Sequence, residues 1–187
     1  NPAIKKARDL IVNGVKEIVE NYDIDGIQFD DYFYPTKDKS FDNEEYNSYL
    51  KAQRDNAMKL SQWRKDNVNK LVKETYKAVH SSKENVVFGI SPQGNIKNND
   101  EIYADVKTWC SQKGYIDYIC PQLYYSLDNP ALAYEDAIND WKKIKKNKDL
   151  VIYSGLAGYK AGTDNDEGTW EDFNDILQKE YKIAVDK

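Results

Sequence analysis

The chain has 187 residues, enough for one domain with a substantial core and too few for two independent domains of ordinary size. Its 27 basic and 32 acidic residues give a net charge of −5, which argues against a nonspecific nucleic-acid surface and a polybasic membrane binder. No apolar run approaches the ~20 residues of a membrane-spanning helix. We therefore expect one soluble domain over residues 1–187, from a processed or truncated protein, without a nucleic-acid partner or a membrane-spanning segment.

Histidine and cysteine are too few for several kinds of site. The one histidine, His80, ends a helical pattern, which disfavours a Ser-His-Asp triad and a multi-histidine zinc site. The spacing of Cys110 and Cys120 matches no zinc ribbon or CxxC motif, so we expect two buried thiols or one optional bridge. We expect no metal and no cofactor. Aromatic residues make up 13% of the chain, which suits sugar stacking or a polar cleft as well as ordinary core packing.

The periodicity of apolar residues predicts the elements of the first half of the chain. Helical spacing predicts a helix over residues 4–21, and the alternation of Ile27 and Phe29 with Gln28 and Asp30 predicts a strand within 25–32. A polar loop follows over 35–43. A short helix is expected over 44–53, and a longer one runs to His80 with Ser61 as its N-cap.

The second half alternates strands with helices. Strands are predicted over residues 86–91, 116–120 and 150–155, and helices over 100–112 and 131–146. The capping pattern Thr169-x-x-Asp172 predicts the start of a final helix.

Apolar strands joined through helices predict a parallel sheet covered by helices. Two architectures fit this order, an open doubly wound sheet and an arc of a (β/α)8 barrel. No strand is followed by GxGxxG or GxxxxGK[ST], so a nucleotide-binding open sheet lacks its phosphate-binding loop. We therefore expect an α/β fold that forms a partial TIM (β/α)8 barrel, with about four of the eight strands.

Polar residues end all four predicted strands, and in a barrel these ends meet at the rim that carries the active site. They are Gln28, Asp30, Asp31 and Tyr32, then Ser91 and Gln93, then Gln122, Tyr124 and Tyr125, and finally Ser154, Tyr159 and Lys160. If Ile27 and Phe29 face the helices, Gln28 and Asp30 face the barrel interior. A carboxylate in that place suits a nucleophile or an electrostatic stabiliser.

Structural alternatives exist for each polar group. Asp30 and Asp31 are also typical of an N-cap or of a turn after a strand. Residues 122–125 are also typical of an aromatic loop that packs on helices. The acidic segment 164–168 matches no EF-hand spacing and is expected to be a solvated loop.

Four motifs follow one another along the chain: DGIQFDDYFYP at 25–35, WRKDNVN at 63–69, GISPQG at 89–94 and PQLYY at 121–125. In this order they resemble the bacterial glycosyl-hydrolase-like family 10, over residues 1 to about 159. The resemblance implies a (β/α)8 barrel of which this chain is the C-terminal half, strands four to seven. It also implies a bacterial, exported protein at the cell surface or outside the cell, and carbohydrate hydrolysis.

Glycosidases usually use two carboxyl groups, about 5 Å apart in retaining enzymes and about 6.5 to 9.5 Å apart in inverting ones. Asp30 stands where α-amylase-like barrels carry their nucleophile, although Gln28 replaces an arginine. In the chitinase-like DGxDxDxE pattern, Gln28 and Tyr32 replace an Asp and the catalytic Glu, which argues against that mechanism. Since the second strand ends without an acid, the proton donor is Asp31, a residue outside this chain, or absent.

We therefore expect Asp30 and Asp31 to be catalytic in a glycoside hydrolase that cleaves O-glycosidic bonds of an extracellular or cell-wall polysaccharide. Substrate contacts are expected from Gln28, Tyr32, Tyr34, Arg64, Ser91, Gln93, Gln122, Tyr124, Tyr125 and Tyr159. The alternative is a non-catalytic carbohydrate-binding barrel with an aromatic rim, and a nucleotide-dependent enzyme is disfavoured. Because half the rim would be absent, we expect the isolated piece to hydrolyse little, and to self-associate through open sheet edges or to shield its lumen with loops.

Overall fold

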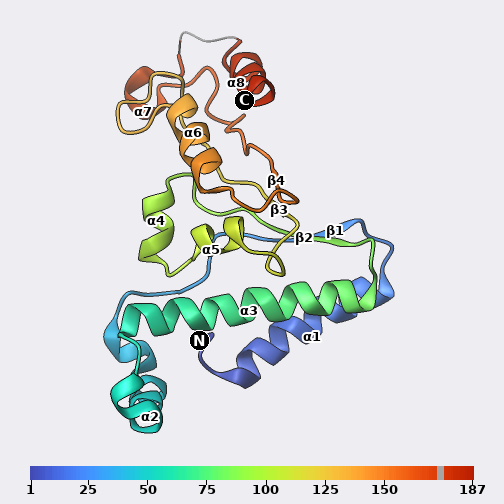
Figure 1. Cartoon of the computed structure of the whole chain (residues 1–187). Coiled ribbons are helices and arrows are strands. Elements are labelled where there is room, and N and C mark those ends of the chain that lie inside the picture. The colour runs from blue at the N-terminus through green and yellow to red at the C-terminus, as the bar shows by residue number, and fades with distance from the viewer. Residues whose placement is uncertain (172–174) are drawn as a thin grey trace.

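The computed structural model of the chain describes residues 1–171 and 175–187. In this part of the chain, strands β1 (Gly26–Phe29), β2 (Val87–Ile90), β3 (Tyr118–Ile119) and β4 (Val151–Ile152) form one parallel sheet in chain order. Helices join each strand to the next, as Figure 1 shows. The expected α/β fold, a four-stranded parallel sheet with covering helices as in a partial (β/α)8 barrel, is confirmed.

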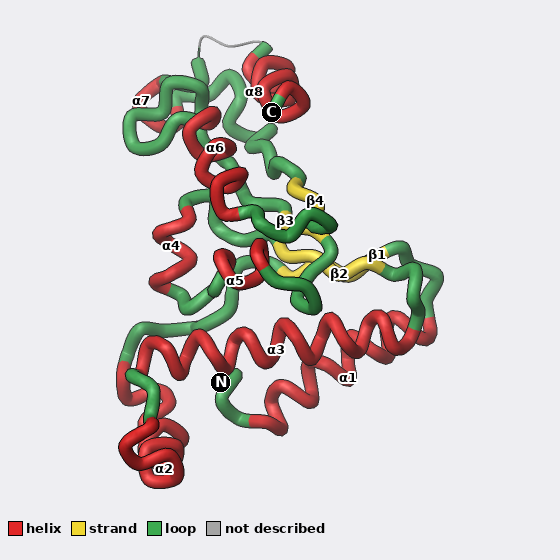
Figure 2. The backbone as a smooth tube through the Cα atoms, viewed as in Figure 1, coloured by secondary structure: helices red, strands yellow, loops and turns green. Residues whose placement is uncertain are grey.

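In the described residues, α-helices and two short 3₁₀ helices precede, join and follow the four strands. Their bounds are α1 (Lys5–Asn21), η1 (Lys39–Asp42), α2 (Asn43–Gln53), η2 (Arg54–Asn56), α3 (Leu60–Ser82), α4 (Ile96–Glu101), α5 (Val106–Ser111), α6 (Tyr134–Ile144), α7 (Asn165–Gly168) and α8 (Ile176–Asp186). Helices α1 and α3 pack along each other below the sheet, and α6 and α8 lie at the opposite end of the molecule (Figure 2). No helix in the described ranges is long and apolar enough to cross a membrane.

Three predicted helix boundaries were wrong or lie outside the described residues. The helix expected over 100–112 is two helices, because Tyr103 takes a left-handed backbone conformation with φ of 60° between α4 and α5. Helix α3 has Lys59 as its N-cap, so Ser61 lies inside the first turn. Asp172 of the expected capping pattern lies outside the described residues, and α8 begins at Ile176.

The two faces of the sheet differ as the alternation predicts. In register, Phe29 pairs with Ile90, Ile90 with Ile119 and Ile119 with Ile152, and this row packs into the core formed with the helices. The other face, here called the open face, carries Gln28 and leaves Val151 45% and Tyr153 55% exposed. The expected orientation of strand β1 is therefore confirmed.

Gly89 occupies the middle of the open face because no side chain fits there. The ring of Tyr118 lies across it, and a Cβ added to Gly89 would stand 2.2 Å from Tyr118 Cζ. This position lets the Tyr118 hydroxyl donate to Gln28 Oε1 at 3.2 Å, so the open face is linked across three strands.

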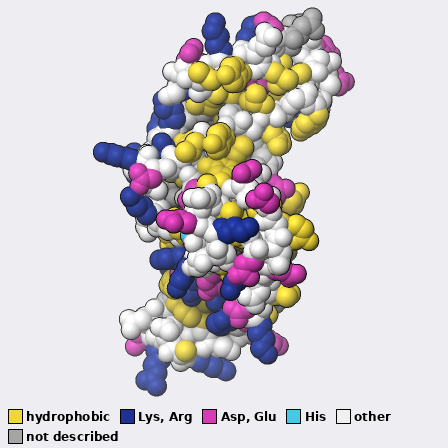
Figure 3. Space-filling view, turned by 90° about the vertical axis from the view of Figure 1, so that its right-hand side faces the viewer, with side chains coloured by type: hydrophobic (Ala, Val, Ile, Leu, Met, Phe, Trp, Pro, Cys, Tyr) yellow, Lys and Arg dark blue, Asp and Glu magenta, His cyan; other side chains and the backbone are white. Residues whose placement is uncertain are grey.

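Figure 3 shows one side of the molecule as a surface. Hydrophobic side chains gather most densely in its upper half, at the height of β4, α6 and α8 in Figure 1. Charged side chains of both signs are mixed over its lower half, at the height of α1 and α3.

Candidate active site

The residues that follow the strands form a rim at one edge of the sheet. Beyond β2 and β3, Pro92 and Pro121 cannot donate to the ladder, and the regular strands stop. The pairing continues as single bridges from Gln93 to Gln122 and from Gln122 to Gly155. The C-terminal ends of the strands are therefore held side by side, as expected for a barrel-like rim.

Asp30 lies at this rim, on the open face and exposed to solvent. Its Oδ1 accepts hydrogen bonds from Gln122 Nε2 at 2.7 Å and from the backbone N–H of Asp31 at 3.0 Å. Gln122 Nε2 also donates to the carbonyl of Ser91 at 3.0 Å. The structure thus brings together Asp30, Asp31, Ser91 and Gln122 from three strand ends.

Aromatic rings lie at the same rim, and the half-buried Tyr124 is close to Asp30 and Asp31. The rings of Tyr124 and Tyr159 meet edge to face with centroids 6.0 Å apart, and Tyr159 is 69% exposed. Burial raises the pKa of the Tyr124 hydroxyl, and Tyr159 and the carboxylates of Asp30 and Asp31 raise it further. Tyr124 is therefore a neutral hydroxyl close to both carboxylates. Tyr32, which follows Asp31 directly, is 90% exposed.

The loop that carries Tyr159 is held by a partly buried ion pair between Lys160 and Asp166. Lys160 Nζ donates to the Tyr124 carbonyl at 3.1 Å and to Asp166 Oδ2 at 2.9 Å. Trp170 Nε1 donates to the same Asp166 oxygen at 2.8 Å. Although burial acts to raise the pKa of Asp166, the hydrogen bonds from Lys160 and Trp170 hold it below its ordinary value.

The segment 164–168 was expected to be a solvated loop, and this holds for only part of it. Asp164, Asn165 and Glu167 are exposed, whereas Asp166 points inward to Lys160. The expectation was wrong for Asp166 because its cation and its indole donor come from neighbouring turns that the acidic composition does not reveal.

Arg64 and Tyr34 were expected to contact substrate, and the structure places both inside the protein. Arg64 on α3 donates to both carboxylate oxygens of Asp42, at 2.7 Å from Nε and 2.6 Å from Nη2, and both side chains are fully buried. The Tyr34 hydroxyl donates to the same carboxylate. Burial and then the Asp42 hydrogen bond raise the pKa of Tyr34 above its ordinary value. Their polar groups are therefore used internally and do not face the rim.

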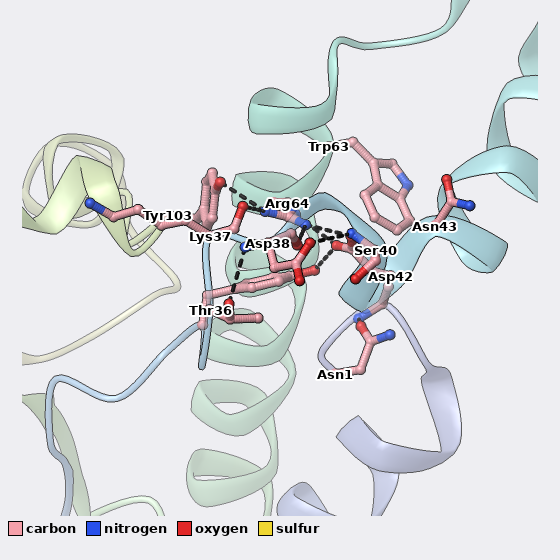
Figure 4. A network of polar contacts seen from close by, with 12 residues as sticks. Asn1, Thr36, Lys37, Asp38, Ser40, Asp42, Asn43, Trp63, Arg64 and Tyr103 are labelled. Atoms are coloured by element: carbon pink, nitrogen blue, oxygen red, sulfur yellow. Dashed lines mark hydrogen bonds and ion pairs between the residues drawn. The ribbon is translucent and has the colours of Figure 1, made fainter.

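This Arg64–Asp42 network holds the segment after β1 against α3. Figure 4 shows Arg64 surrounded by Asp42, the backbone of Asp38 and Tyr103. Its guanidinium also lies 5.1 Å from the ring centres of Tyr34 and of Tyr103, which places it between two aromatic faces. Sequence reasoning missed Asp42, although an arginine within the apolar side of a helix is a signal that a carboxylate partner is needed.

The remaining expected contact residues are divided between the open face and the core. Gln28 is exposed on the open face below Asp30. Ser91 is buried and presents its carbonyl to Gln122, and Gln93 is half-buried at the same level. Tyr125 packs against the core, so the alternative of an aromatic loop packed on helices describes this residue.

Three further residues named from the sequence are Ser154 and the two cysteines. The Ser154 and Tyr134 hydroxyl groups share a hydrogen bond of 2.7 Å, on the helix side of the sheet. Cys110 and Cys120 are free thiols, and Cys110 is fully buried. Within the described ranges, no cluster of three or more His, Cys, Asp or Glu side chains could hold a metal ion.

Comparison with known proteins places this rim in a family. The sequence profile of the family Glycosyl hydrolase-like 10 matches residues 1–172. The chain is 37% identical to glycosyl hydrolase YngK of Bacillus subtilis over 96% of its own length and 38% of that protein. It is 35% identical to glycosyl hydrolase DigH of Escherichia coli K12, and of Shigella flexneri, over 87% of its length and 40% of theirs.

The chain thus spans about two fifths of the length of these curated relatives. The matched region contains all four strands of the sheet and every rim residue described above. The chain belongs to the Glycosyl hydrolase-like 10 family.

Proposed function

We propose that this chain carries part of the active site of a glycoside hydrolase, in which Asp30 acts as nucleophile or base on an O-glycosidic bond. The observation that carries the proposal is the setting of Asp30: a solvent-exposed carboxylate at the end of β1, oriented by Gln122 and close to the half-buried Tyr124. Two relatives that bear the name glycosyl hydrolase support it.

The rim supplies a place for the sugar as well as for the chemistry. Tyr32, Tyr124 and Tyr159 present flat faces against which a pyranose ring can stack. Asp31 lies next to Asp30 in the chain and is the candidate proton donor within this chain; a carboxyl group from the rest of the protein is the alternative.

For the whole protein we propose a barrel of which residues 1–187 form the C-terminal half, acting outside the cell or at the cell surface on a polysaccharide. The open face of the sheet supports this arrangement, because exposed Val151 and Tyr153 would be covered by further strands. We propose in addition that the isolated chain associates through its free strand edges and hydrolyses little.

A non-catalytic carbohydrate-binding barrel is the second candidate. It is favoured by the exposure of Tyr32 and Tyr159, since stacking on these rings needs no acid.

The substitution Asp30→Asn in the full-length protein that carries this chain separates the two candidates. It keeps the shape of the side chain and removes its charge, so we expect turnover to fall by several orders of magnitude with little loss of stability. Reducing ends released from purified bacterial cell-wall glycan, xylan and cellulose measure turnover, and co-sedimentation measures binding. Equal turnover by both proteins excludes Asp30 as a catalytic residue, and binding by the parent without hydrolysis favours the carbohydrate-binding barrel.

A further inference from the structure

The hydrogen bonds of Asp30 are distributed unequally between its two oxygens. Oδ1 accepts from Gln122 Nε2 and from the Asp31 N–H, whereas no hydrogen bond to Oδ2 is found within the described ranges. Because the Asp30 side chain is exposed at the rim, Oδ2 remains available to accept a hydrogen bond from a ligand. The two oxygens are thus chemically distinct before any substrate binds.

Gln122 is well suited to impose this difference. Its side-chain NH₂ has two hydrogens, one for Asp30 Oδ1 and one for the Ser91 carbonyl. A rotation of the amide by 180° would turn Oε1 toward two acceptors, so only one orientation satisfies the contacts. The amide nitrogen therefore has no hydrogen left for a substrate.

The backbone of Gln122 is as constrained as its side chain. It forms bridges to Gln93 on one side and Gly155 on the other, and its N–H donates to the Pro92 carbonyl at 2.9 Å. A Cβ on Gly94 would stand 2.2 Å from the Gln122 carbonyl oxygen, so the glycine permits a close approach of the two chains. Gln122 therefore reaches from the third strand to the first from a fixed base.

We propose that Gln122 is a positioning residue that orients Asp30 and leaves Oδ2 as the oxygen presented to the substrate. This inference rests on the proposed function, in which Asp30 is the catalytic carboxylate. It reassigns Gln122, which had been expected to bind substrate directly. When a second side chain holds a catalytic residue in productive geometry, removing that side chain lowers the reaction rate rather than the affinity for substrate.

The test uses the full-length protein and whichever polysaccharide of the panel above it hydrolyses. Gln122→Met keeps the length of the side chain and removes both donors. We expect it to lower kcat about ten- to hundred-fold while KM changes by less than about threefold. Gln62→Met, at an exposed position on α3, is the matched control and should leave both constants unchanged.

Gln122→Glu gives a readout that a merely structural role would not produce. At pH 7 the introduced carboxylate repels the Asp30 carboxylate. At lower pH the protonated acid can donate the hydrogen bond that the amide supplied. We expect kcat of Gln122→Glu, relative to the parent at each pH, to recover from pH 7 toward pH 5, with no such recovery in Gln122→Met.

Failure of this inference and failure of the proposed function give different results. If Asp30→Asn is inactive while folded Gln122→Met keeps the parent kcat, or changes KM alone, the positioning role is refuted. If Asp30→Asn is fully active, the proposed function fails instead.

NMR spectroscopy tests the contact without substrate. Asp30→Asn should shift the side-chain amide resonance of Gln122 and leave that of Gln62 in place. An unmoved Gln122 resonance would overturn the contact itself.

Discussion

Glu180 on α8 shows how one residue can make stability depend on pH. Its side chain is fully buried, and neither carboxylate oxygen has a hydrogen-bond partner within the described ranges. Burial raises its pKa to about 7 from the ordinary 4.5. The folded chain therefore holds a proton that the unfolded chain releases, so the contribution of Glu180 to stability is largest below about pH 4.5 and is lost as the pH rises toward 7.

Glu180→Met should remove this dependence. Methionine has a similar volume and no charge, so we expect the free energy of unfolding at pH 8 to rise by about 3 kcal/mol relative to the parent. Urea unfolding at pH 5 and pH 8 measures the free energy of unfolding of both proteins. Glu180→Gln is the control, because it also abolishes the pH dependence but keeps a buried polar group and should gain less stability. An equal slope against pH in the parent and in Glu180→Met would contradict the assignment.

At the scale of elements, α3 connects the rim segment with the opposite end of the sheet. Near its start, Arg64 holds the segment after β1 through Asp42. Near its end, His80 Nε2 lies 3.0 Å from Asp117 Oδ2, and this carboxylate also accepts the N–H of Phe88 at 2.7 Å. The helix thus contacts both the residues that follow β1 and those that precede β3.

Breaking the Arg64–Asp42 ion pair with Asp42→Asn should destabilise the chain, because it leaves the buried guanidinium of Arg64 without its carboxylate. We expect a loss of about 3 to 5 kcal/mol in the free energy of unfolding, measured by urea titration and circular dichroism. The double substitution Arg64→Met with Asp42→Leu removes both charges and should recover most of that loss. Asp9→Asn breaks the exposed Lys5–Asp9 pair and should change stability little. A small effect of Asp42→Asn would show that the Arg64–Asp42 network does not hold this segment.

At the scale of the whole molecule, the core packs on the face of the sheet that carries Phe29, Ile90, Ile119 and Ile152. Within residues 1–171 and 175–187, β1 and β4 each pair with one strand, and the open face exposes Val87, Val151 and Tyr153. Free edges and exposed apolar side chains favour pairing with another chain.

We therefore expect the isolated chain to associate as its concentration rises, and sedimentation velocity at micromolar to hundred-micromolar concentrations would measure this. Val151→Lys places a charge on the open face beside the free edge of β4 and should weaken the association. Lys107→Ala, at an exposed position on α5 away from that face, should not. A chain that stays monomeric across the whole range would contradict this prediction.

Sequence alone determined the features that depend on local periodicity. Ile27 and Phe29 alternate with Gln28 and Asp30, and this period of two is enough to place Asp30 on the open face. Parallel strands joined by helices also determined that the strand ends share one rim. The four motifs, of which three lie at strand ends and one on α3, were sufficient to identify the family because they follow one another in a fixed order along the chain.

Only the tertiary structure decided what the polar side chains of these motifs contact. Arg64 meets a carboxylate 22 residues away, and Gln122 meets Asp30 across 92 residues, so no local pattern distinguishes a buried partner from a substrate contact. Tyr103 interrupts a helical pattern, and its hydroxyl and ring contact Arg64 in the folded chain. Burial and pairing are set by the three-dimensional neighbours of a charge, whereas periodicity records only which side of its own element a residue occupies.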